Sequence, residues 1–183
     1  TYQAASGSGK DGVEELLQQS SAYIDQRSID KRVYPKQIAF NSIPFVDCFL
    51  ENNYTREEMK MVWETHKILD KNISVNPTAV RVPVLVGHAE SIYVETEKEI
   101  DIEIAKNCLN EFAGISVIDD VQEVDFPTSF EHGHGTDDVY VGRIRKGLNK
   151  NNSLNLWVVA DNVRKGAALN SIQIAENLVG RKM

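Results

Sequence analysis

Three segments of the chain carry apolar residues at the spacing of an α-helix. They are residues 13–26, 101–112 and 163–179. Apolar side chains that recur every three or four positions fall on one face of a helix, so each segment is expected to bury one face. A fourth helix is expected to begin after Thr55 and to end near Leu69, because Thr55-Arg-Glu-Glu58 is a capping box. Asp161 or Asn162 is expected to cap the last helix.

Between these helices, short runs of apolar and β-branched residues predict strands. They cover residues 78–95 (as one or two strands), 115–118, 138–145 and 154–160. Residues 6–12 are rich in glycine and predict a flexible loop, and the proline-broken segment 33–49 predicts irregular, buried structure. Helices and strands do not alternate in a regular βαβ order, and no segment has the composition of a domain linker. The pattern favours one α+β domain over residues 1–183, with a mixed, largely antiparallel sheet covered by helices.

Composition and charge limit the classes of function. With 183 residues, 42% hydrophobic and 26% charged, the chain is long enough to bury a sizeable core. A net charge of −7 argues against a nucleic-acid partner. No apolar run approaches the length of a membrane span, and the start has no signal-peptide pattern. Two cysteines do not make a disulfide framework, which fits a reducing cytoplasm.

The segment Arg81-Val-Pro-Val-Leu-Val-Gly-His88 carries the clearest candidate chemistry. An arginine binds a carboxylate or phosphate through two parallel hydrogen bonds, and a histidine accepts a proton near neutral pH. A buried strand that ends in a surface histidine would have the same sequence. In a straight strand, residues an odd number of positions apart face opposite sides. A shared site for Arg81 and His88 therefore requires a bend, for which Pro83 and Gly87 are the candidates.

Metal and thiol chemistry are not expected in this chain. His132 and His134 lie near acidic residues, but no other Cys or His completes a zinc site at a recognised spacing. Cys48 and Cys108 are both expected to be buried among apolar residues and therefore unreactive. The chain also lacks a strand followed by Gly-x-Gly-x-x-Gly, the dinucleotide-binding fingerprint.

Four motifs, in this order, resemble the aspartate-semialdehyde dehydrogenases over nearly the whole chain. They are Thr1-Tyr-Gln-Ala-Ala-Ser-Gly-Ser-Gly9, Glu64-Thr-His-Lys67, the Arg81–His88 segment and Asp161-Asn-Val-Arg-Lys-Gly-Ala-Ala-Leu-Asn170. The resemblance implies the catalytic and dimerisation half of that family, with a fold like the C-terminal domain of glyceraldehyde-3-phosphate dehydrogenase-like enzymes. It also implies a fragment that begins just after the family's nucleophilic cysteine. Its last helix, 163–179, would pack on the missing NADP-binding domain, and the fragment alone would be inactive and bind NADP weakly.

The same resemblance implies roles for individual residues. Arg81 would bind the α-carboxylate of the substrate, His88 would be the general base, and Gln3 would orient the substrate beside the cysteine. The other implied contacts are the substrate ammonium group for Glu64, phosphate for Lys67, and NADP for Ser6, Gly7 and Asn162. From the residues alone, the more common explanations are a solvated helix pair for Glu64 and Lys67, a flexible loop for Ser6 and Gly7, and a helix cap for Asn162. A glutamine near a chain terminus, such as Gln3, is most often exposed. His66 is expected to be a surface residue.

For the intact enzyme, the resemblance implies interconversion of aspartate 4-semialdehyde and 4-phospho-aspartate by a homodimer that uses phosphate and NADP. This reaction serves lysine, threonine and methionine biosynthesis. One alternative is an N-acetyl-glutamyl-phosphate reductase, although its acylated amine would leave Glu64 with no ammonium group to bind. A second alternative, from a different class, is a dimerisation module without catalytic function. None of these readings includes a nucleic-acid or membrane partner.

Overall fold

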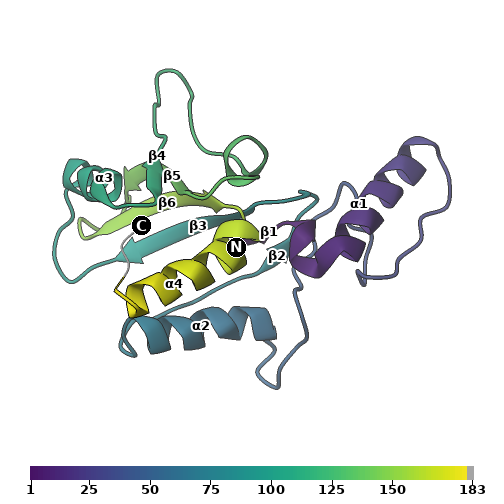
Figure 1. Ribbon diagram of the computed structural model, residues 1–183, viewed down its shortest axis with the longest axis horizontal. Helices are drawn as coiled ribbons and strands as arrows, with labels where there is room; N and C mark the ends of the chain where they lie inside the picture. Colours follow the sequence, from purple (N-terminus) through teal and green to yellow (C-terminus); the bar gives the residue numbers. More distant parts are fainter. Residues whose placement is uncertain (181–183) are drawn as a thin grey trace. The chain divides into compact units, whose positions relative to one another are not determined.

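The computed structural model describes residues 1–180, and its chain divides into two compact units. The first unit spans Thr1–Leu85 and the second begins at Val86. Each unit has its own strands and helices (Figure 1). In the described part of the chain, no helix is both long enough and apolar enough to cross a membrane.

The first unit combines a short parallel strand pair with two helices. Its elements are β1 (Tyr2–Gln3), the 3-10 helix η1 (Ala5–Ser8), α1 (Gly9–Ile24), α2 (Arg56–Ile68) and β2 (Val80–Arg81). In the β1–β2 pair, Gln3 lies opposite Arg81. Side chains at paired positions of neighbouring strands project to the same face. The pairing therefore brings two of the predicted site residues together.

The glycine-rich segment near the start is helical, so the prediction of a flexible loop over residues 6–12 was wrong. Residues 5–8 form η1, and α1 already begins at Gly9, where the backbone φ is +77°. Hydrogen bonds hold the segment in place: Ala5 N donates to Val84 O at 2.7 Å and Ser6 N donates to Leu85 O at 2.9 Å. Tertiary hydrogen bonds of this kind override the local flexibility that glycine provides.

A buried carboxylate joins α1 to the irregular segment 33–49, which forms no helix or regular strand, as predicted. Glu15 and Gln19 are 1% and 2% exposed, one helical turn apart, and hydrogen-bonded to each other at 2.9 Å. The Glu15 carboxylate accepts hydrogen bonds from the backbone amides of Arg32 and Val33, and the Gln19 carbonyl accepts one from Ile38 N. Because buried polar groups require partners, these two side chains fix the path of the segment over the core.

Helix α2 begins as the sequence predicts. Thr55 Oγ1 accepts a hydrogen bond from Glu58 N at 3.2 Å, and the Glu58 carboxylate accepts one from Thr55 N at 2.8 Å. The other oxygen of Glu58 accepts a hydrogen bond from Ala79 N at 3.0 Å. The capping residue therefore also fixes the start of α2 to the segment that leads into β2.

The second unit is a four-stranded sheet with helical segments around it. Its elements are β3 (His88–Glu95), α3 (Ile102–Glu111), β4 (Ile115–Val117), the π-helix η2 (Ser129–Gly133), β5 (Val139–Lys146), β6 (Ser153–Ala160), the π-helix η3 (Arg164–Leu169) and α4 (Asn170–Leu178). The strand order is β3-β6-β5-β4, antiparallel except for the parallel β4–β5 pair. Helix α3 packs beside β4 and β5 (Figure 1). These elements confirm the α+β class with a mixed, largely antiparallel sheet.

Two expectations about burial in the second unit were wrong: that Phe112 lies on the buried face of residues 101–112, and that Cys108 is buried. Phe112 is 66% exposed, because α3 ends at Glu111 and the chain turns there. Cys108 is exposed on the outer face of α3. In the first unit, Cys48 is also only half-buried. Helical spacing gives the face of each residue but not which face the sheet covers.

The last helical segment exposes its apolar side chains. Val163 is 52% exposed, Ile174 61% and Leu178 82%. No residue of α4 is buried. That this helix packs on an NADP-binding domain stays a prediction.

Candidate functional site

A group of polar side chains gathers around the β1–β2 pair of the first unit. Gln3 and Arg81 are each only 6% exposed. The carboxamide nitrogen of Gln3 donates to Glu57 Oε1 at 3.0 Å, and Lys60 Nζ donates to Glu57 Oε2 at 2.9 Å. A strand pair and the first turns of α2 thus combine two predicted site residues with two that the prediction did not include.

Arg81 is held by the backbone of the chain's first residues. Its Nη1 donates to Ala4 O at 2.8 Å. Burial lowers the pKa of Arg81, whereas the negative charge of Glu57 opposes this change. A guanidinium group stays protonated at any physiological pH even when its pKa falls. Arg81 therefore presents a buried, preoriented positive charge.

Glu57 is the counter-charge within this group. Burial alone would raise the pKa of Glu57, but hydrogen bonds from Gln3 and Lys60, with the positive charges of Lys60 and Arg81, lower it below the ordinary value. An ionised carboxylate only accepts hydrogen bonds. The Gln3 amide group must therefore turn its NH2 toward Glu57, which orients the carboxamide.

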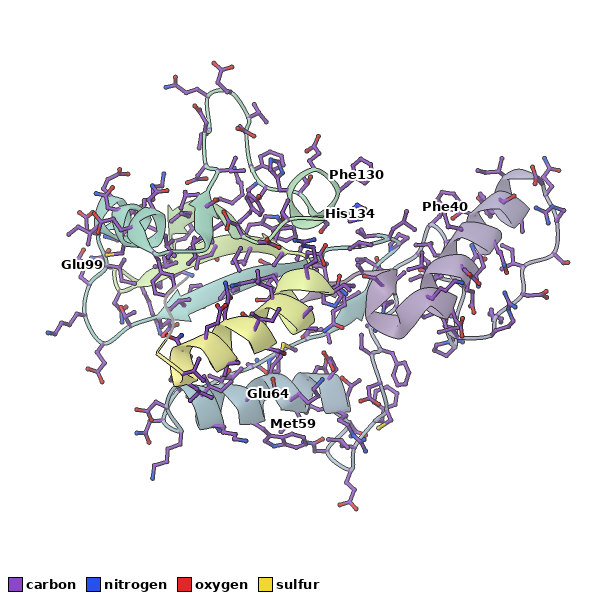
Figure 2. The ribbon with its side chains drawn as sticks, in the orientation of Figure 1. Phe40, Met59, Glu64, Glu99, Phe130 and His134 are labelled. Carbon is purple, nitrogen blue, oxygen red and sulfur yellow. The ribbon has the colours of Figure 1, made fainter. Side chains whose placement is uncertain are left out.

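Glu64 and Lys67 lie two helical turns further along the same face of α2, and both are exposed. Figure 2 labels Glu64 on this helix. Its negative charge contributes to raising the pKa of Lys60, after the larger effect of the Glu57 hydrogen bond and against burial. Among residues 1–180, neither Glu64 nor Lys67 forms an ion pair. Their predicted contacts with substrate and phosphate stay predictions.

The sequence contains a signal that would have found Glu57 and Lys60. A Glu-x-x-Lys pattern occurs twice in α2, at Glu57-Glu-Met-Lys60 and at Glu64-Thr-His-Lys67. The two copies are seven residues apart, so they share one helix face. Only the position of the helix against β1 distinguishes them, and it brings the first copy to Gln3.

No continuous strand joins Arg81 to His88. β2 ends at Arg81 and β3 begins at His88, with no strand between them. Gly87 has a φ of +93°, and a Cβ there would lie 2.8 Å from Ser129 O. Only glycine fits this backbone without strain. The straight strand that would have excluded a common site is absent, and the convergence of Arg81 and His88 stays a prediction.

His88 opens β3 opposite Ala160 of β6 and is half-buried. The preceding residue, Gly87, is bonded to the segment that follows β6, because Gly87 N donates to Asn162 Oδ1 at 3.0 Å. Asp161, the neighbour of Asn162, caps the last helical segment by accepting hydrogen bonds from Val163 N and Arg164 N. The structure therefore decides between the two candidate caps in favour of Asp161.

Ser6 and Gly7 are predicted to contact NADP, but their backbone amides already form hydrogen bonds within the first unit. Ser6 N donates to Leu85 O at 2.9 Å and Gly7 N donates to Ala4 O at 3.0 Å. A cofactor contact at these positions would have to use other atoms. The NADP roles of Ser6, Gly7 and Asn162 stay predictions.

His132 and His66 have local partners. His132 Nδ1 accepts a hydrogen bond from Thr128 N at 3.1 Å, and its ring lies 5.6 Å from that of Tyr140. His66 Nε2 lies 2.8 Å from Ile73 O. Over residues 1–180, no three His, Cys, Asp or Glu side chains are grouped to hold a metal ion.

Comparison with known sequences places this geometry in context. A family model described as "Semialdehyde dehydrogenase, dimerisation domain" matches residues 1–165. An aspartate-semialdehyde dehydrogenase of Shewanella violacea is 54% identical over 180 residues, which are 98% of this chain and 53% of that protein. One of Legionella pneumophila is 50% identical over 179 residues, 97% of this chain and 52% of that protein. The chain thus spans about half the length of these curated relatives.

Solved structures agree with these matches. Aspartate semialdehyde dehydrogenase II of Vibrio cholerae, complexed with ASA, has a TM-score of 0.94 and 49% identity, covering 100% of this chain and 54% of that one. A probable aspartate-semialdehyde dehydrogenase of Pseudomonas aeruginosa has a TM-score of 0.91 and 32% identity, covering 97% and 53%. A Candida albicans enzyme with NADP has a TM-score of 0.63 and 26% identity, covering 78% and 45%. The fold predicted from the sequence is therefore confirmed.

Proposed function

Because the chain belongs to the semialdehyde dehydrogenase dimerisation-domain family, we propose that it is the substrate-binding and dimerisation half of an aspartate-semialdehyde dehydrogenase. The intact enzyme would be a cytoplasmic homodimer. One observation carries the proposal: a buried arginine, an ionised glutamate and an oriented carboxamide lie together in the first unit. The Vibrio cholerae relative, whose structure is described as complexed with ASA, aligns with the whole of this chain.

The charges of this group match an α-amino acid. Aspartate 4-semialdehyde presents a carboxylate and an ammonium group on one carbon. Arg81 would bind the carboxylate through its planar fork. Glu57, beside Gln3, is the better placed carboxylate for the ammonium group, and Glu64 is the one implied by resemblance. For phosphate, Lys60 and Lys67 are the corresponding candidates.

His88 would act as the general base of the reaction. It would take the proton of a cysteine thiol supplied by the other half of the enzyme, and the thiolate would add to the aldehyde carbon. NADP would supply the hydride acceptor for the oxidation of this adduct to a thioester. Phosphate oxygen then attacks the thioester, and the cysteine leaves as a thiolate that recovers its proton from His88. Gln3 would bind the substrate oxygen while it carries negative charge.

The same charges argue against the alternative substrate. An N-acetyl-glutamyl substrate has a neutral amide in place of the ammonium group. An ionised glutamate next to it would lose its water without gaining a partner, which is costly. The position of Glu57 therefore favours a free amino group.

The test is a hybrid enzyme in which this chain follows the part of the Vibrio cholerae relative that it does not match. We expect NADPH formation that requires aspartate 4-semialdehyde and phosphate, and no turnover of N-acetyl-glutamate 5-semialdehyde. His88→Ala in the hybrid is expected to abolish turnover, and the isolated chain is expected to have none. A folded hybrid that prefers the acetylated substrate, or that turns over neither, would refute the proposal.

The dimer is tested separately. We expect light scattering to give twice the monomer mass for the chain at micromolar concentration, since two-fold dimers are the commonest assembly. A monomer at all concentrations would count against a dimerisation role for the isolated chain.

A further inference from the structure

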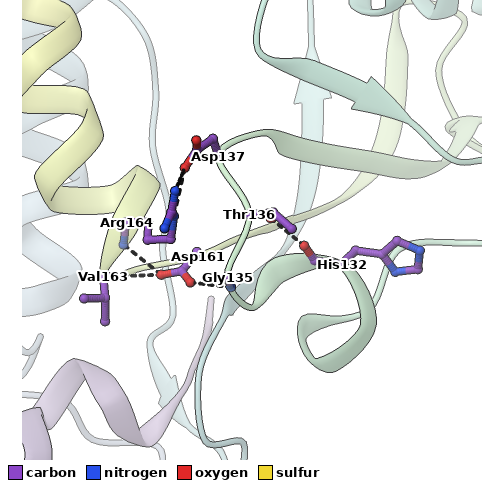
Figure 3. A network of polar contacts seen from close by, with 7 residues as sticks. All are labelled: His132, Gly135, Thr136, Asp137, Asp161, Val163 and Arg164. Carbon is purple, nitrogen blue, oxygen red and sulfur yellow. Dashed lines mark hydrogen bonds and ion pairs between the residues drawn. The ribbon is translucent and has the colours of Figure 1, made fainter.

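The turn formed by Asp161 and Asn162 contacts three other segments of the second unit. Asp161, 2% exposed, accepts hydrogen bonds at 2.8 Å from Val163 N, Arg164 N and Gly135 N (Figure 3). Asn162 Oδ1 accepts the hydrogen bond from Gly87 N. One turn thus joins the start of η3, the segment after η2 and the residue before β3.

The turn is itself rigidly held. Burial would raise the pKa of Asp161, but the three backbone hydrogen bonds, with the charge of His134, lower it below the ordinary value. Arg164 donates from Nε to Asp137 Oδ1 at 2.8 Å, which adds a second connection between the same two segments (Figure 3). At neutral pH, these hydrogen bonds of Asp161 and Arg164 therefore hold the backbone on both sides of Asn162 in place.

Gly87 is confined from two sides. Its φ of +93° and the closeness of Ser129 O leave no space for a side chain. On the other side, its amide is held by Asn162. The next residue, His88, is the first of the β3–β6 ladder and pairs with Ala160, directly before the turn.

We propose that Asn162 is a positioning residue for His88. Its carboxamide oxygen holds the Gly87 amide and so fixes the backbone from which the His88 imidazole projects. The inference rests on the proposed function, in which His88 is the general base. It differs from the cofactor contact that the resemblance implies for Asn162. A proton-transfer group must be placed within a fraction of an ångström to act efficiently.

The first measurement uses the chain as it is. In Asn162→Ala, hydrogen exchange of the Gly87 amide is expected to become about tenfold faster, and the His88 ring signal in the NMR spectrum to shift. Asn162→Asp keeps an acceptor oxygen and is expected to retain slow exchange. Asn170→Ala, an exposed asparagine at the start of α4, is the matched control and should change neither signal. Unchanged exchange and ring signals in Asn162→Ala would overturn the proposal.

The second measurement uses the hybrid enzyme. Asn162→Ala is expected to lower kcat about tenfold with little change in KM for the semialdehyde or NADP, and Asn162→Asp to restore most of the kcat. Equal losses in both variants with a raised KM for NADP would show a cofactor contact instead and refute the positioning role. If the unsubstituted hybrid lacks semialdehyde activity, the proposed function fails, and the exchange and ring signals alone decide whether Asn162 positions His88.

Discussion

Gln3 and Glu57, 54 residues apart in the sequence, are joined by a hydrogen bond of 3.0 Å between Nε2 and Oε1. This contact orients the carboxamide that the proposed reaction needs. It also distinguishes the two Glu-x-x-Lys copies of α2, because it places the first copy at the β1–β2 pair. Substitutions of Glu57 and Glu64 can therefore be compared to test which glutamate binds the substrate ammonium group.

In the hybrid enzyme, we expect Glu57→Gln to lower kcat/KM for aspartate semialdehyde by about ten- to a hundredfold. The substitution removes the charge proposed to bind the ammonium group and leaves the Gln3 amide free to flip. Steady-state kinetics measure the effect, and Glu64→Gln on the same helix face is the control, expected to stay within about twofold. A large loss for Glu64→Gln with a small one for Glu57→Gln would return the ammonium contact to Glu64.

Arg81→Lys should also lower kcat/KM by about ten- to a hundredfold. A lysine ammonium is a point charge that cannot bind both carboxylate oxygens in the plane of a guanidinium group, nor keep the hydrogen bond to Ala4 O in the same geometry. Arg56→Lys, at the exposed start of α2, is the matched control and should be nearly neutral. Kinetics that do not distinguish the two variants would remove Arg81 from the substrate site.

The buried Asp161 should make stability depend on pH. Because its pKa is lower in the folded chain than the unfolded value of about 3.9, its contribution is complete above that value and is lost as pH falls through the folded pKa. Asp161→Asn is expected to lower the free energy of unfolding by about 1.5–3 kcal/mol at pH 7, with a smaller difference in acid. Urea titrations at several pH values measure this. Asp137→Asn, whose side chain is 53% exposed, should cost at most about 1 kcal/mol.

Glu15→Ala is expected to destabilise the first unit by about 2–4 kcal/mol. The substitution leaves the backbone amides of Arg32 and Val33 and the Gln19 side chain without their buried acceptor. Thermal or urea unfolding measures the loss. Glu14→Ala, the neighbouring glutamate with a side chain 49% exposed, should change stability by less than about 0.5 kcal/mol. Equal effects would show that the carboxylate does not hold the segment.

Local chemistry made several features predictable from the sequence alone. The capping box at Thr55 and Glu58 acts over one helical turn, so its residues determine where α2 begins. Apolar runs predicted the strands after residue 78, and Gly87 was one of two candidates for the bend before His88, because a backbone with positive φ favours glycine. The two-residue strand β1 was not predicted. The motifs that resemble a known family sufficed to predict the fold that the solved relatives confirm.

Only the tertiary structure decided between positions that are equivalent locally. Glu57 and Glu64 share a helix face and a pattern, and the docking of α2 on β1 selects Glu57 for Gln3. Asp161 and Asn162 are both residues that commonly cap helices. In the structure, Asp161 caps the last helical segment, whereas Asn162 accepts the hydrogen bond from Gly87 N. Cys108 has the spacing of a core residue but lies outside. Sequence periodicity specifies which residues share a face, whereas contacts between segments distant in the chain determine what that face meets.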